Sequence, residues 1–70
     1  MKLLIVVERT ETGYSAHSPD LPGCIAAGPN RESVEQEMRD AIAFHLEGMR
    51  AAGDPLPVPS SYATYVEVAA

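Results

Sequence analysis

Three side chains that could perform nucleophilic or acid–base chemistry lie close together in the first third of the sequence. His17, Asp20 and Cys24 bring an imidazole, a carboxylate and a thiol near one another. In such a set the imidazole activates the thiol and the carboxylate orients the imidazole. No other motif of a nucleophilic site accompanies these residues, however. We therefore interpret Cys24 as a buried core residue and do not assign a catalytic role to any of the three.

The second histidine could in principle bind a metal ion. His45 falls on the apolar side of the helix expected in this region, and the residues four positions before and after it are Ala41 and Met49. A metal site needs several ligands, and neither neighbour can supply one. The sequence therefore predicts no catalytic residue, no metal site and no cofactor.

Three short strands are expected in the first part of the chain. Lys2–Arg9 is rich in β-branched residues and runs into a turn at Thr10–Gly13. Tyr14–Ser18 is expected as a second strand, antiparallel to the first. The loop Pro19–Gly23 contains two prolines and a glycine, and it leads to a third strand at Cys24–Gly28.

One amphipathic helix is expected next. Asn30 is a suitable N-cap, whereas Ser33–Gln36 forms a competing capping box, which leaves the start open by three residues. Spacings of three and four residues relate the apolar-side positions Val34, Met38, Ala41, Ile42, His45, Leu46 and Met49. Gly53 suits the C-terminal end of the helix.

A fourth strand is expected at Tyr62–Val68, where aromatic and β-branched residues recur. It follows an extended connector, Asp54–Pro59, in which three prolines prevent a helix. A right-handed crossover makes strands three and four parallel and places the first strand centrally, in the order 3-2-1-4. The predicted fold class is therefore α+β, with the order β-β-β-α-β and one helix on one face of a four-stranded sheet. A partner or a second copy is expected on the other face or on the edge of strand four.

Length and cysteine content limit the number of domains and the means by which the fold can be stabilised. Seventy residues suffice for one domain with a thin core. One cysteine cannot form an internal disulfide, so we expect a homo-oligomer, dimeric or higher, to supply stability. The single cysteine and the lack of a signal-type leader predict a cytoplasmic protein. Leu3–Val7 is too short to cross a bilayer, so no membrane role is expected.

Charge points to the kind of partner. Ten acidic and five basic residues give a net charge of -5. That charge repels phosphate groups, which argues against direct nucleic acid binding, and it favours a basic partner. The alternative is that the charge only keeps a small protein soluble.

The segment from Ser18 to Cys24, Ser-Pro-Asp-Leu-Pro-Gly-Cys, is followed by Ala27-Gly28 and a Glu-rich amphipathic helix. This combination resembles the HicB-like antitoxin family over essentially the whole chain. The resemblance implies a partial ribonuclease H-like fold and a protein that binds and neutralises a small basic HicA-type toxin, which cleaves mRNA. Many members also carry a C-terminal DNA-binding segment. Here we expect a single HicB-like domain over residues 1–70, with no appended DNA-binding domain.

The ribonuclease H-like fold raises the possibility of a nuclease. Such an enzyme needs several carboxylates that converge on Mg²⁺, normally including one within the central first strand. Leu3–Val7 contains no carboxylate, and Glu8 lies only at the end of that strand. The helix carboxylates are typical of a solvated face. We therefore predict that the chain is not an enzyme.

Partner contacts are expected in the loop and in the last strand, and two functions are compatible with them. The candidate residues are Asp20, Leu21, Pro22, Gly23, Tyr62 and Tyr65. Leu21 could present its side chain outward or place it in the core, and Asp20 could meet a basic partner or accept hydrogen bonds from its own loop. The leading hypothesis is an antitoxin. The alternative is a self-associating structural or small-ligand module of the same fold without a toxin partner.

Overall fold

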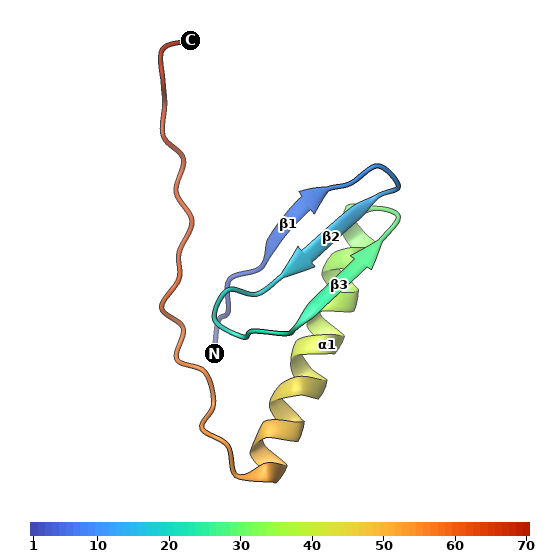
Figure 1. Cartoon of the computed structure of the whole chain (residues 1–70), viewed down its shortest axis with the longest axis vertical. Coiled ribbons are helices and arrows are strands. Elements are labelled where there is room, and N and C mark those ends of the chain that lie inside the picture. Colours follow the sequence, from blue (N-terminus) through green and yellow to red (C-terminus); the bar gives the residue numbers. More distant parts are fainter.

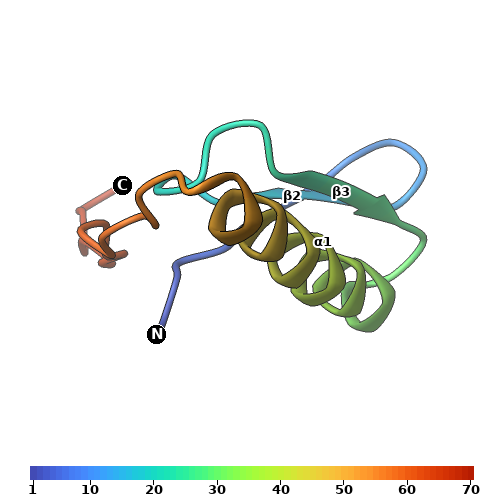
Figure 2. The same cartoon turned by 90° about the horizontal axis from the view of Figure 1, so that it is seen from below.

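The computed structural model describes all of residues 1–70 and consists of three strands followed by one helix. Strands β1 (Val6–Arg9), β2 (Tyr14–His17) and β3 (Ile25–Gly28) form an antiparallel sheet in the order β1-β2-β3. Helix α1 (Arg31–Ala52) packs across one face of that sheet (Figure 1). Figure 2 shows the resulting two layers. The predicted α+β class and the first four elements of the predicted order are confirmed.

Strand β1 is shorter than the predicted Lys2–Arg9 because its partner strand is short. Val6 pairs with His17 and Arg9 pairs with Tyr14, so the ladder stops where β2 ends, two residues before Pro19. Beyond the ladder, the Ser18 hydroxyl donates to the Leu4 carbonyl at 2.9 Å. This bond satisfies a buried hydroxyl and ties the chain before β1 to the end of β2.

Both ends of α1 follow the predicted capping residues. Asn30 is the N-cap: its side-chain oxygen accepts from the Ser33 amide at 2.8 Å, and its own amide donates to the Ser33 hydroxyl at 3.3 Å. The earlier of the two possible starts is therefore the correct one. At the other end Gly53 adopts a left-handed backbone (φ 77°), and its amide donates to the Arg50 carbonyl at 3.2 Å.

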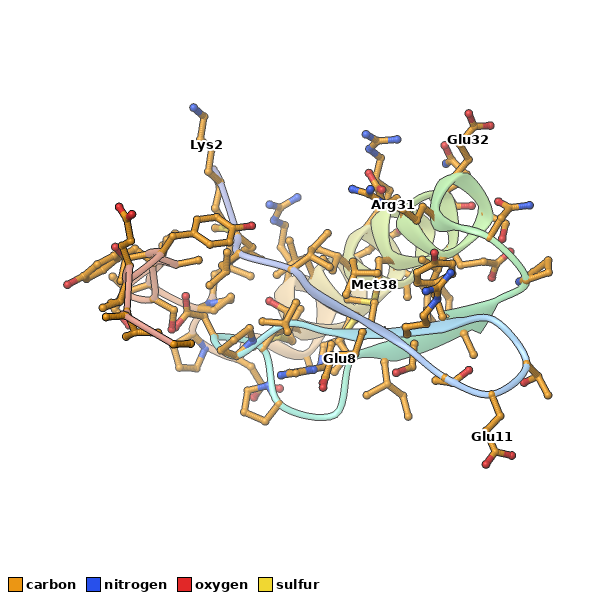
Figure 3. The ribbon with its side chains drawn as sticks, turned by 90° about the horizontal axis from the view of Figure 1, so that it is seen from above. Lys2, Glu8, Glu11, Arg31, Glu32 and Met38 are labelled. Atoms are coloured by element: carbon orange, nitrogen blue, oxygen red, sulfur yellow. The ribbon has the colours of Figure 1, made fainter.

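A small core lies between the sheet and the helix. Its buried apolar residues are Ala16, Leu21, Cys24, Val34 and Met38. Leu3, Ile5 and Val7 pack against this cluster from the first part of the chain, as their alternation predicts. Figure 3 shows Met38 in the layer between helix and sheet. The chain has no helix with both the length and the hydrophobicity that a membrane crossing needs.

The predicted fourth strand, Tyr62–Val68, is not part of the sheet. After α1 the chain turns back on the β1 side of the molecule and runs beside the sheet in Figures 1 and 2. No backbone–backbone hydrogen bond involves a residue after Asp54. The structure thus corrects the four-stranded order 3-2-1-4 to three strands. The composition of this segment favours a strand, but a strand also has to pair with another, and Ser60 just before the segment is bonded to Asp20 in the loop after β2.

Candidate protein interaction surface

Asp20 joins the loop after β2 to the chain after α1. Its carboxylate accepts four hydrogen bonds from two serines: the Ser60 and Ser61 amides donate to Oδ2, both at 3.1 Å. The Ser60 and Ser61 hydroxyls donate to Oδ1 at 3.1 and 2.9 Å. These bonds stabilise the charged form and lower the pKa of Asp20, with the Ser61 amide as the largest cause. We call this set of three residues the Asp20 clamp.

The sequence prediction missed the clamp. Of the two roles considered for Asp20, one was contact with a basic partner and the other was capping of its own loop. The structure instead joins Asp20 to residues forty positions away. Serines after a proline run are common in loops, so no local pattern indicates that Ser60 and Ser61 meet this carboxylate.

The rest of the loop divides into an inward and an outward part. The Leu21 amide donates to the Ser18 carbonyl at 3.1 Å, and the Cys24 amide donates to the Leu21 carbonyl at 3.2 Å. These turns hold the Leu21 side chain in the core, with 2% of its surface exposed. The predicted partner contact through Leu21 is therefore corrected to a core role. Pro22 and Gly23 are exposed, and Gly23 has the positive φ of 87° that its turn requires.

The two candidate tyrosines are fully available to solvent. Tyr62 is 83% exposed and directly follows the Asp20 clamp, so the clamp brings it to the same region as the Pro22–Gly23 tip. Tyr65 is 100% exposed and lies further along the same segment. Four of the six predicted contact residues are thus exposed, Asp20 acts as an anchor, and Leu21 is buried.

A second open surface is the face of the sheet opposite α1. Opposed residues in neighbouring strands share a face, and one cross-strand row on the outer face consists of Val6, His17 and Ile25. His17 and Ile25 are exposed, and a hollow of about 560 Å³ lies over β2 and β3 at this face. The face is uncovered because one helix shields only the other side.

The groups that could perform chemistry are not assembled into a site. Cys24 is 4% exposed, and burial raises the pKa of its thiol, which makes a thiolate nucleophile unfavourable. His17 is exposed, while Asp20 is engaged by two serines. Glu8 and Glu32 point away from opposite sides of the molecule in Figure 3. No group of three or more His, Cys, Asp or Glu residues is placed to hold a metal ion.

Comparison with known protein families shows which family the chain belongs to. One family model, described as the HicB-like antitoxin of bacterial toxin-antitoxin systems, matches residues 3–69, nearly the full length. The chain belongs to the HicB-like antitoxin family. The match begins before β1 and extends through the segment that carries Ser60, Ser61 and both exposed tyrosines.

Individual proteins are also similar to this HicB-like chain. A chain of the solved HicA3 and HicB3 toxin-antitoxin complex superimposes with a TM-score of 0.67 at 29% identity, covering 83% of this chain and 72% of that one. An uncharacterised 14.9 kDa protein of Haemophilus phage HP1 is 34% identical over 62 residues, which are 89% of this chain and 47% of the phage protein. A UPF0150 protein of Helicobacter pylori is 33% identical over 51 residues, covering 73% and 71%. The chain thus spans about half the length of the phage relative.

Proposed function

We propose that this HicB-like chain is an antitoxin that binds and neutralises a small basic HicA-type toxin that cleaves mRNA. The observation that carries the proposal is the likeness to a chain from a toxin-antitoxin complex, at 29% identity and over 83% of this chain. The family match over residues 3–69 supports the same role. We further propose that the chain acts in the cytoplasm, by binding and not by catalysis.

Charge would bring the two proteins together. The net charge is -5, and exposed carboxylates line the solvent side of α1, among them Glu32, Glu37 and Glu47. A basic toxin would be attracted by this field before any specific contact forms, which raises the association rate more than the final affinity. The same negative charge repels the phosphate groups of RNA, the toxin's substrate, so the antitoxin would not itself bind that RNA.

Contact would then involve the exposed loop tip and the tyrosines. Pro22 and Gly23 lie exposed in the loop, and the Asp20 clamp ties the residue before Tyr62 to the same loop. Tyrosine side chains often contribute much of the binding energy at interfaces, because a large apolar ring and a hydroxyl are buried with little loss of conformational entropy. We propose that Pro22, Gly23, Tyr62 and Tyr65 touch the partner and that Asp20 positions them.

The test uses as its probe a small basic HicA-type protein, sought first in the reading frame that adjoins this gene. Its RNA-cleaving activity should fall to background when an equimolar amount of the HicB-like chain is added. Tyr65→Ala should weaken the complex by about tenfold or more. The matched control is Phe44→Ala, which removes another exposed ring, on α1, and should change the affinity by less than about threefold. Undiminished RNA cleavage at equimolar antitoxin would disprove the proposal.

A second candidate is a self-associating module of the same fold that has no toxin partner. Five of the eight large exposed hydrophobic residues, Val58, Tyr62, Tyr65, Val66 and Val68, follow the helix. Exposed apolar side chains of this kind favour association. A neighbouring gene without a short basic product, together with recovery of the chain from its host only as a homo-oligomer, would favour this candidate over the antitoxin.

A further inference from the structure

One edge of the sheet combines an unpaired strand with an apolar groove. In the order β1-β2-β3, the outer edge of β1 has no neighbouring strand, so its backbone groups on that side lack partners in the sheet. Beside it, a groove of about 310 Å³ runs between the start of the chain and α1. Six of its seven lining residues are apolar: Met1, Leu3, Ile5, Ile42, Ala43 and Leu46, with Arg39 as the seventh. A strand added to β1 would cover this groove.

The segment Tyr62–Val68, which we call the arm, is a strand-like segment that has no edge to pair with. It has the composition of a strand but forms no backbone–backbone hydrogen bond. Tyr62, Val66 and Val68 are each at least 73% exposed, and Tyr65 is completely exposed. Apolar side chains and backbone groups that could form a ladder are thus left in water, and an exposed sheet edge satisfies both.

The alternation of the arm fits the groove. In an extended strand successive side chains point to opposite faces, so Tyr62, Thr64, Val66 and Val68 share one face. The other face carries Ala63, Tyr65 and Glu67. The face with both valines matches the apolar groove, whereas the face with Glu67 suits the solvated outer side of the sheet. This assignment leaves Tyr65 accessible beside the outer face, and Tyr62, the first residue of the arm, stays next to the Asp20 clamp of its own chain.

The arm does not close on the β1 edge of its own chain. The Asp20 clamp holds Ser60 and Ser61, immediately before the arm, with four hydrogen bonds. From there the arm runs on the β1 side of the molecule, separate from β1 in Figure 1. A second copy offers the same free edge and the same groove. Mutual exchange of arms satisfies both copies at once and closes a two-fold symmetric dimer.

We propose that the arm of one copy pairs with β1 of a second copy as a fourth strand, and that the exchange is reciprocal. A second copy is favoured over the basic toxin because both halves of the contact are present on this one chain. The arm also carries a single charged residue, Glu67, so it has little to select a basic protein. The arm-exchanged dimer does not depend on the proposed antitoxin function, and its test requires no toxin.

The first test measures association. The wild-type chain should sediment with twice the monomer mass and dissociate on dilution. Val66→Asp places a carboxylate against the apolar groove and should raise the dimer dissociation constant by at least about tenfold. The matched control, Ala63→Asp, adds the same charge on the other face of the arm and should change that constant by less than about threefold. Both sites are exposed in the single chain, so circular dichroism should show an unchanged monomer fold.

The second test locates the arm. An equimolar mixture of isotope-labelled and unlabelled chain should give filtered nuclear Overhauser contacts between Val66 of one copy and the β1 region, Leu3–Val7, of the other. The proposal is overturned if those contacts arise within one chain. It is also overturned if the wild-type chain stays monomeric at millimolar concentration, or if the contacts between copies involve His17 and Ile25 on the outer face and not the arm.

Discussion

At the scale of single residues, two neighbours in one loop have opposite roles. Leu21 is a core residue, whereas Asp20 beside it is half-buried and accepts hydrogen bonds from the chain that follows the helix. The sequence Pro-Asp-Leu-Pro-Gly contains both functions within five positions. The loop therefore contributes to the proposed interaction surface through Asp20 and its exposed tip, and it contributes to the core through the buried Leu21 side chain.

Truncation of Leu21 should destabilise the fold, whereas truncation of the next residue should not. Leu21→Ala removes a buried side chain and should lower the free energy of unfolding by about 2–5 kcal/mol. Pro22→Ala, at an exposed position, should cost less than about 1 kcal/mol. Urea unfolding at one fixed protein concentration measures both. If Leu21→Ala does not fold, Leu21→Met should, at a cost below about 1.5 kcal/mol. Equal stability of the Leu21→Ala and Pro22→Ala variants would contradict the core role.

The Asp20 clamp should open in acid. Its hydrogen bonds lower the pKa of Asp20 in the closed state, so the carboxylate favours closure at neutral pH. That contribution is lost as the pH falls through the lowered pKa, so the opening midpoint should lie below about pH 3.9, the ordinary value for Asp. The amide NMR shifts of Ser60 and Ser61 report the transition. Asp20→Asn should abolish it, and an unchanged midpoint in that variant would assign the transition to another group.

At the scale of elements, the sequence predicts what local signals determine. The ends of α1 follow from Asn30 and Gly53, because caps act within three or four residues. The hairpin of β1 and β2 follows from the turn residues Thr10–Gly13, which the sequence shows directly. Tyr62–Val68 has a strong strand composition, but its neighbour is decided by contacts distant in sequence. The Asp20 clamp is also non-local, so neither the arm's position nor Ser60 and Ser61 could be predicted.

The junction of β3 with α1 requires a glycine. A Cβ on Gly28 would lie 2.5 Å from the Ser33 hydroxyl oxygen and 3.0 Å from the Val34 amide nitrogen. The hydroxyl can rotate but the helix backbone cannot, so Gly28→Ala should destabilise the fold by about 1–3 kcal/mol. Gly48→Ala is the matched control, because nothing lies within 4 Å of its Cβ position on α1. That change should stabilise the helix by up to about 1 kcal/mol. In thermal unfolding, Gly28→Ala should melt below the wild type and Gly48→Ala at or above it. If both variants melted below the wild type by similar amounts, the steric role of Gly28 would be refuted.

At the scale of the whole molecule, the chain has little interior relative to its surface. Six of 70 residues are buried, and the molecule extends 49 × 27 × 16 Å. Such a core provides few of the apolar contacts that stabilise larger domains. The uncovered sheet face, the groove beside β1 and the arm therefore all present apolar groups that association can bury. The acidic charge is spread over the remaining surface, notably the solvent side of α1.

If this charge steers a basic partner, its effect should appear in the association rate. Glu37→Gln combined with Glu47→Gln changes the net charge from -5 to -3 at two exposed positions. In stopped-flow mixing with a small basic HicA-type protein that the chain binds, the association rate constant should fall about two- to tenfold at low salt, with little change in dissociation. The difference should vanish near 0.5 M salt, because screening then acts within a few ångströms. Glu37→Asp with Glu47→Asp keeps the charge and should associate like the wild type. A loss expressed only in the dissociation rate would instead place these carboxylates in direct contact with the partner.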